Sequence, residues 1–261
     1  MVLEEVINQT ILFIGTFTAT LFASVSGGGA GFIQFPLLIL LGLPFGTALG
    51  THKVAVVFLG IGAISKKFKT KNYFTFDKGV ALAMLLVGCP AVVLGSVIIL
   101  TVPANIAQIG LGFIIIGFGC YSFIKKEFGC NRIENRSLTR TILGCVCLFV
   151  IGLFSGSLSS GAGLFATIAL IGVFGLDLKT AIMHTMIFVA TIWNAVGAFT
   201  VGALTTICWQ WIPCMIIAAF SGSFLGTTLL VNMPVKKVKV IFSSVAILSG
   251  VILIWEGFAA N

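Results

Sequence analysis

The chain has 261 residues, of which 59% are hydrophobic and 8% are charged, and its mean hydropathy is +1.19. This composition excludes an ordinary water-soluble domain, because the folded chain needs lipid rather than water around it. The net charge of +8 could suggest a nucleic-acid partner, but thirteen of the fifteen basic residues lie in three short clusters between apolar segments. Such clusters are typical of loops that orient membrane proteins, so we expect no nucleic-acid partner.

Long stretches without formal charge predict several membrane-spanning helices. These stretches are residues 6–52, 79–124, 141–176, 180–235 and 240–255. One crossing needs only about 20 apolar residues, and the stretches are apolar on all sides rather than alternating as in a membrane barrel. Glycines, prolines and charges divide them into predicted helices, in chain order 6–26, 46–64, 78–100, 105–124, 141–158, 180–200, 209–231 and 238–258.

Two short apolar pieces remain, at residues 32–42 and 164–175. At a rise of about 1.5 Å per residue, each piece covers only about half of the hydrocarbon core. We therefore expect half-helices or re-entrant segments at these two places.

The two halves of the chain repeat one another in sequence. Gly29-Ala30-Gly31 recurs as Gly161-Ala162-Gly163. Four further matches keep the same order, namely Gly42-Leu43 with Gly175-Leu176, Thr47-Ala48 with Thr180-Ala181, Leu94-Gly95 with Leu225-Gly226, and Pro103 with Pro234. The offsets are 131 to 133 residues, which indicates duplication of a unit of about 130 residues.

The basic residues indicate that matching loops lie on opposite sides of the membrane. The loop at 65–78 holds five lysines, whereas its counterpart at 201–208 has none. The turn at Pro103 has no basic residue, whereas three lysines follow Pro234. By the positive-inside rule the repeats are inverted, which favours five plus five crossings if the short pieces count and puts both termini outside.

The predicted fold class is therefore an all-α polytopic integral membrane protein. It has 8 to 10 transmembrane segments in two duplicated, inverted-topology repeats with broken or re-entrant helices. We expect a first membrane repeat at 1–124, a basic cytoplasmic loop at 125–140 and a second membrane repeat at 141–261.

Both candidate helix breaks are rich in glycine and serine. Inverted repeats with broken helices hold a substrate near the midplane, where the N-termini of half-helices can face an anion. Glycines let the backbone approach a ligand, hydroxyls donate hydrogen bonds, and helix-start N–H groups attract negative charge. The alternative is that small residues merely let helices pack closely. The candidate substrate-binding residues of the two breaks are Ser26, Gly27, Gly28, Gly29, Gly31, Ser159, Ser160, Gly161 and Gly163.

A second candidate feature is Thr51-His52-Lys53. Lys53 follows a long charge-free stretch, and a cation is costly inside a membrane, so it could meet the substrate anion or a coupling proton. Alternatively it lies two turns into its helix and extends to an interface. His184-Thr185 falls at the matching step of the second repeat, which gives the only two histidines of the chain equivalent positions. For each histidine a transport role stands beside a packing role.

Other residue types add one candidate and no cofactor. Asn194, in an apolar helix, could bind substrate or join two helices. The seven cysteines form no C-x-x-C pair and six lie in apolar stretches, so we expect small hydrophobic residues rather than disulfides or a metal site. No phosphate-binding G-x-x-x-x-G-K-[ST] motif occurs, so no nucleotide is expected.

The same residues resemble the TauE/SafE sulfite exporter family, also called the TSUP transporters. The resemblance spans essentially the whole chain and rests on the order Gly29-Ala30-Gly31, Pro36, Gly42-Leu43-Pro44 and Ala48-x-Gly50-Thr51. A family subgroup has Gly-Thr-Asn-Lys at the last step, where this chain has His52 before Lys53. The resemblance implies a secondary carrier in a prokaryotic plasma membrane for sulfite, organosulfonates or related carboxylate anions, often linked to protons.

We therefore expect a transporter of small anions that works by alternating access, with lipid and a small anion as partners and a proton as a candidate coupling ion. An anion channel is the nearer alternative, because the same groups can line a pore. An intramembrane serine hydrolase with Ser160 and His184 is the other, although a G-x-S-G motif would need glycine at Leu158. The chain is thus not expected to be an enzyme, and the sequence leaves its oligomeric state open.

Overall fold

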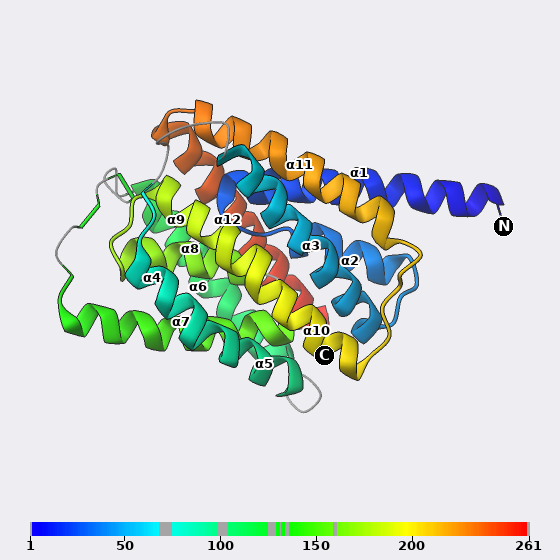
Figure 1. Cartoon of the computed structure of the whole chain (residues 1–261), viewed down its shortest axis with the longest axis horizontal. Helices are drawn as coiled ribbons and strands as arrows, with labels where there is room; N and C mark the ends of the chain where they lie inside the picture. The colour runs from blue at the N-terminus through cyan, green and yellow to red at the C-terminus, as the bar shows by residue number, and fades with distance from the viewer. Residues whose placement is uncertain are drawn as a thin grey trace.

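The computed structural model describes residues 2–67, 75–98, 104–124, 129–130, 132–133, 136–158 and 161–259. All regular elements in this part of the chain are helices (Figure 1). The first half contains α1 (Val2–Ser26), α2 (Gly31–Leu40), α3 (Phe45–Lys67), α4 (Lys78–Ala83), the π-helix η1 (Met84–Gly88), α5 (Cys89–Ile98) and α6 (Ala104–Ile124). The second half contains α7 (Leu138–Leu158), α8 (Ala162–Gly172), α9 (Leu178–Thr185), the π-helix η2 (Met186–Trp193), α10 (Asn194–Leu204), α11 (Ile212–Asn232) and α12 (Val235–Ala259).

Helix lengths confirm a polytopic helical membrane protein. Six segments are long and apolar enough to cross a membrane, namely Glu5–Ser26, Phe45–Ser65, Lys78–Ile98, Leu138–Ser157, Leu178–Leu204 and Ile212–Asn232. The two predicted short pieces appear as α2, with 10 residues, and α8, with 11 residues. The π-helical turns η1 and η2 were not predicted, because wider helical turns leave no clear sequence signature.

The two halves of the molecule run in opposite directions. In Figure 1, α1 starts at the end that carries the N-terminus, whereas its counterpart α7 starts at the other end and runs the opposite way. Likewise α3 and the matching α9–η2–α10 segment finish at opposite ends. This course is the one that inverted repeats require.

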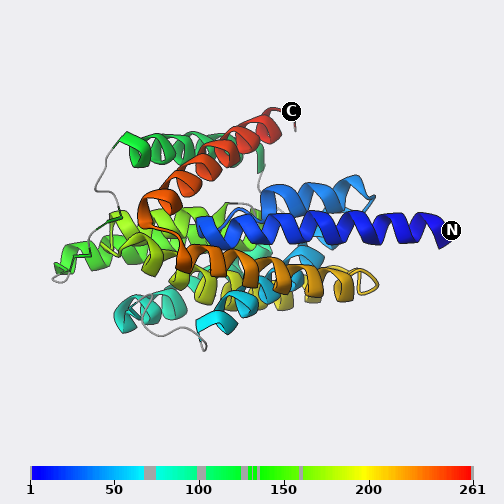
Figure 2. The same ribbon diagram turned by 90° about the horizontal axis from the view of Figure 1, so that it is seen from above.

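The packing contacts between the two halves also follow the internal duplication. The last helices of the two halves, α6 and α12, pack against each other along one side of the molecule (Figure 2). A Cβ atom on Gly112 would lie 2.7 Å from the carbonyl oxygen of Gly250, and one on Gly119 would lie 3.2 Å from that of Ser243. An offset of 131 residues exchanges these two contacts, so each half supplies the same close-packing surface.

The two helix breaks meet at the centre of the molecule. Gly27, Gly28 and Gly29 before α2 and Gly161 before α8 all have positive φ, a backbone conformation that glycine adopts at little cost. The backbones touch there, because a Cβ atom on Gly163 would lie 2.8 Å from the Gly27 carbonyl oxygen and 2.9 Å from the Gly28 Cα. The hydroxyl of Thr167 in α8 donates to the same Gly27 oxygen at 3.1 Å.

We predict that Gly163→Ala destabilises the protein by about 1–3 kcal/mol, because the added methyl group would meet backbone atoms that cannot rotate away. Gly172→Ala is the matched control, since Gly172 ends the same helix and a Cβ there would meet nothing within 4 Å. Thermal unfolding of both variants in detergent measures the difference. Equal melting temperatures would contradict the close crossing of the breaks.

Candidate functional site

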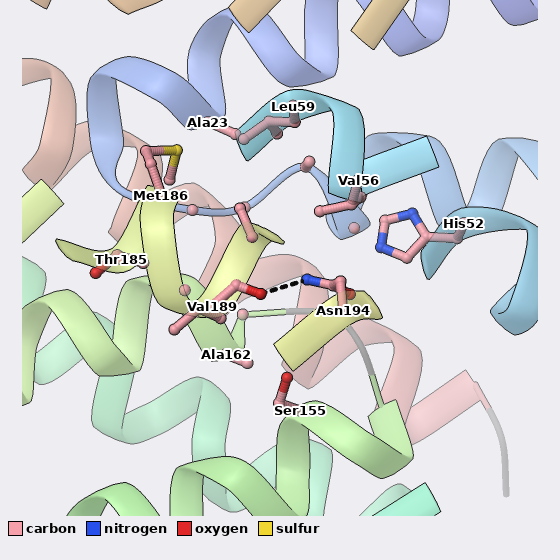
Figure 3. A pocket seen from close by; sticks show the side chains of 17 residues that line it. Ala23, His52, Val56, Leu59, Ser155, Ala162, Thr185, Met186, Val189 and Asn194 are labelled. Atoms are coloured by element: carbon pink, nitrogen blue, oxygen red, sulfur yellow. Dashed lines mark hydrogen bonds between the residues drawn. The ribbon is translucent and has the colours of Figure 1, made fainter. Parts of the chain in front are cut away.

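A pocket lies where the two helix breaks meet (Figure 3). Its empty space, including the open mouth, is about 410 Å³. The wall contains Ala23 of α1, the start of α2, parts of α3, the end of α7, the start of α8, and η2 with the first residue of α10. The lining residues are Ala23, Gly28, Gly29, Ala30, Gly31, His52, Val56, Leu59, Ser155, Gly161, Ala162, Gly163, Thr185, Met186, Val189, Ala190 and Asn194.

Two helix starts contribute to this wall. The first N–H groups of a helix have no carbonyl partner within it, and they carry partial positive charge. Gly29, Ala30 and Gly31 at the start of α2 and Gly161, Ala162 and Gly163 at the start of α8 all line the pocket. Both repeats therefore direct the positive end of a half-helix toward the same space, which suits a negative ligand.

The π-helix η2 forms another part of the wall. Its wide turns leave carbonyl groups that side chains satisfy: Asn194 Nδ2 donates to the Val189 oxygen at 2.8 Å, and the hydroxyl of Thr191 donates to the Met186 oxygen at 3.1 Å. Figure 3 shows the Asn194 bond beside the pocket. Asn194 thus stabilises a turn of its own helical segment instead of joining two helices, and it lies in the pocket lining, where substrate binding stays a prediction.

His52 lines the pocket and is held from behind. Its side chain is 1% exposed, and its Nδ1 lies 2.8 Å from Oε1 of Gln34 in α2. Gln34 in turn donates from Nε2 to the hydroxyl of Thr16 in α1 at 3.2 Å. Figure 3 shows the imidazole ring directed into the pocket. The ring orientation is therefore fixed by a buried hydrogen-bonded chain across three helices.

Lys53 lies just behind the wall rather than in it. Its side chain has no exposed surface, it packs against Gly197 of α10, and its Nζ donates to the Ser155 carbonyl oxygen at 2.6 Å. Ser155 itself lines the pocket. Among the described residues the ion pairs are those of Asp77, so Lys53 has no carboxylate partner within that part of the chain. The alternative that Lys53 extends to a membrane interface is wrong.

The two histidines do not occupy equivalent positions. The offset of 133 residues in this region pairs Thr51 with His184 and His52 with Thr185. Contacts follow that register, since His52 bonds Gln34 while Thr185 bonds Thr167, which is the counterpart of Gln34. Our sequence interpretation was shifted by one residue, which turns a helical side chain by about 100°. The pocket therefore contains His52 but not His184.

Thr51 and His184 instead hold loops in place. The Thr51 hydroxyl accepts from the backbone N–H of Cys208 at 3.0 Å, and His184 Nε2 accepts from the backbone N–H of Asp77 at 3.0 Å. His184 Nδ1 donates to the Thr180 carbonyl at 2.8 Å. Both residues thus face away from the lining, each toward a connection between two helices.

The remaining candidate residues of the breaks are divided between wall and support. Gly28, Gly29, Gly31, Gly161 and Gly163 line the pocket. Ser26 and Gly27 are not in its lining, and the Ser26 hydroxyl bonds the Phe22 and Gly28 carbonyl oxygens at 2.9 and 2.8 Å. Ser159 and Ser160 lie outside the described residues.

Three polar residues near the pocket were not among the candidates. Ser155 and Thr185 line it, and Gln34 holds His52. A single amide side chain within the apolar piece 32–42 was a usable signal for Gln34, by the same reasoning that singled out Asn194. Among the described residues, no group of three or more His, Cys, Asp or Glu side chains could hold a metal ion.

Asp77 forms an ionic cluster at the loop beside His184. Its carboxylate accepts from Val80 N–H at the start of α4 and pairs with Arg132, at 2.8 Å, and with Arg136. Partial burial alone would raise the pKa of Asp77, but the hydrogen bonds from Arg136 and Val80 and the charges of Arg136 and Arg132 lower it to about 2.

A helical membrane protein with a pocket between inverted halves, lined by two half-helix starts, has the architecture of a secondary transporter. The chain belongs to the TauE/SafE sulfite exporter family, since the family described as "Sulfite exporter TauE/SafE" matches residues 11–253. It is a multi-pass membrane protein of transporter type, and a prokaryotic inner membrane is consistent with this family.

Two curated relatives carry transporter names. A "Probable membrane transporter protein ORF9" of Sinorhizobium sp is 25% identical over 237 residues, which are 90% of this chain and 88% of the relative. A "Probable membrane transporter protein" of Haemophilus influenzae is 24% identical over 238 residues, which are 91% of this chain and 89% of the relative. No solved structure matches the chain.

We predict that Asp77→Asn lowers the free energy of unfolding by about 1–3 kcal/mol at neutral pH, because both arginines lose their carboxylate partner. Asparagine still caps a helix, so the loss reports the ion pairs. Because the pKa of Asp77 is lower in the folded protein, its contribution is present above pH 3.8 and is lost as the pH falls through about 2. The difference between variant and wild type should shrink over that interval.

Asp177→Asn is the matched control, since Asp177 caps α9 by accepting from Thr180 N–H at 3.0 Å, as Asp77 accepts from Val80 N–H at 3.0 Å. Asparagine and aspartate cap about equally well, so this variant should stay within about 0.5 kcal/mol of wild type. Thermal unfolding in detergent across the pH range measures both variants. If both variants lost the same free energy of unfolding at neutral pH, the ion pairs of Asp77 would not explain the loss.

Proposed function

We propose that the chain is a secondary transporter that moves small oxyanions, either sulfur-containing or carboxylate, by alternating access. The observation that carries this proposal is the central pocket built from both helix starts, with Lys53 directly behind its wall. Neither repeat contains a complete site, because each supplies one helix start.

The charge distribution supports an anion as the ligand. None of the described residues that line the pocket is acidic, and the wall contains two helix starts and the polar residue Ser155. Lys53 adds a cationic group that is joined to the wall through Ser155. In a membrane interior a cation without a carboxylate partner is costly, and a bound anion would offset that cost.

The position of the pocket supports alternating access. Segments of both repeats surround the ligand space, so a rocking motion of one half against the other could open it to either side in turn. The connections near both ends dock on corresponding residues, with Cys208 on Thr51 and Asp77 on His184. In a carrier with two access states, one of these contacts would be released in each state.

We include no catalytic step in this function. A serine hydrolase would need His184 as a base, but both of its ring nitrogens are engaged, Nδ1 with the Thr180 carbonyl and Nε2 with the Asp77 N–H. The residue is also fully buried and outside the pocket lining. These contacts argue against a hydrolase that uses His184 as its base.

We predict that Lys53→Gln weakens anion binding at least about tenfold, equivalent to about 1.4 kcal/mol, because the site loses its cation. The matched control is Lys179→Gln, since Lys179 also donates to a backbone carbonyl, that of Val231, at 3.1 Å but does not adjoin the pocket. Ligand-induced thermal stabilisation of the purified protein with sulfite, sulfate, thiosulfate, sulfoacetate and short carboxylates measures binding. Unchanged affinity in Lys53→Gln would remove Lys53 from the site.

Proteoliposomes test transport itself. A carrier should show saturable uptake and counterflow of the labelled anion that binds, and Lys53→Gln should reduce both while Lys179→Gln retains them. Current without exchange would identify a channel and contradict alternating access.

A further inference from the structure

The chain Thr16–Gln34–His52 is a buried polar arrangement whose purpose packing does not explain. All three side chains lie within helices that face lipid elsewhere, and they are 0%, 0% and 1% exposed. A hydrophobic residue at each position would avoid the cost of burying polar groups. The arrangement ends at the pocket, because His52 lines it and neither Gln34 nor Thr16 does.

The hydrogen bonds fix which nitrogen of His52 carries the proton. Gln34 uses Nε2 to donate to Thr16, so its Oε1 faces His52 Nδ1. A carbonyl oxygen only accepts hydrogen bonds, and Nδ1 must therefore be the protonated nitrogen. In the neutral ring the other nitrogen, Nε2, then has a lone pair and needs a donor.

Asn194 is constrained in a similar way. Its amide nitrogen donates to the Val189 carbonyl at 2.8 Å, so the amide oxygen is the atom left to meet other partners, and it only accepts. His52 comes from the first repeat and Asn194 from the second. A pocket whose helix starts and hydroxyls offer donors thus also contains acceptors.

Acceptors are unfavourable next to a fully deprotonated oxyanion, which has only lone pairs to present. They are favourable when one oxygen of the anion carries a proton. A site that hydrogen-bonds an O–H group rejects an analogue without it by up to about 10⁴-fold, because the buried acceptor is left unpaired. The same contrast separates the singly protonated form of an oxyanion from its dianion.

We propose that the pocket selects an oxyanion in its singly protonated form, with the O–H group donating to His52 Nε2. Gln34 and Thr16 are positioning residues that hold the ring in the required tautomer. This inference rests on the proposed function and narrows its substrate class. Lys53, the neighbouring charged residue on α3, directs Nζ to Ser155, and His52 contacts uncharged Gln34 and Phe35 on α2. The other described residues of the lining contain no titratable side chain.

Sulfite and sulfate provide the test. Sulfite takes up one proton below the second pKa of sulfurous acid, whereas sulfate has no O–H group on either side of that pH and reports any change in the protein itself. Titration of the purified protein with each anion, at one pH below that pKa and at one pH above it, gives four affinities. At the lower pH we expect hydrogen sulfite to bind at least about tenfold more tightly than sulfate, and at the higher pH we expect the preference to fall to about twofold or less.

His52→Leu should abolish the preference at the lower pH, because no acceptor remains. His52→Asn is a second variant that keeps a polar partner for Gln34 but is too short to reach the pocket as Nε2 does, so it should also lose the preference. Gln34→Leu should weaken the preference by releasing the ring. His184→Gln is the control and should retain it, since His184 lies outside the lining.

Equal affinities of the wild-type protein for hydrogen sulfite and sulfate would overturn this inference and leave anion transport intact. A preference that survives in both His52 variants would also overturn it. If neither anion binds at either pH, this inference fails, and the proposed function fails with it only if thiosulfate, sulfoacetate and the short carboxylates do not bind either.

Discussion

The close contact between the two helix breaks is the constraint on which the rest of the structure depends. Gly28 and Gly163 bring backbone against backbone, and any side chain there would separate the halves. Because the breaks touch, the starts of α2 and α8 face one space instead of two. The glycines therefore shape the pocket in two ways. They place no side chain between the touching backbones, and they allow the backbone conformations of the breaks.

The sequence predicted the helices, the duplication and the glycine breaks, because each depends on composition or spacing. It could not predict side-chain direction within a helix. Lys53 and His52 are adjacent, yet one turns to the Ser155 carbonyl and the other to the pocket. A one-residue register error was enough to equate His184 with His52, although His184 matches Thr51. The role of Gln34 depends on the packing of α2 against α3, which brings its side chain to His52.

The two ends of the molecule use the same docking positions with different chemistry. Thr47 in α3 bonds the hydroxyl of Thr206 at 3.0 Å, and its counterpart Thr180 in α9 accepts from the backbone of Thr75 at 3.3 Å. Only at the second end does an ionic cluster, that of Asp77, reinforce the contact within the described residues. Duplication thus preserved the docking positions, while the contacts at the two ends diverged in kind.

The same divergence explains why a symmetric architecture can hold an asymmetric site. The step that carries Gln34 and His52 in one half carries Thr167 and Thr185 in the other, with a hydroxyl pair at 2.9 Å in place of the amide and imidazole. Hydroxyls both donate and accept, whereas an imidazole with one nitrogen fixed by Gln34 has a defined role at the other. In the proposed mechanism, a ligand between the halves would meet a directional acceptor from the first half that the second half does not repeat. The duplicated fold would thereby gain selectivity without losing the backbone symmetry that alternating access would use.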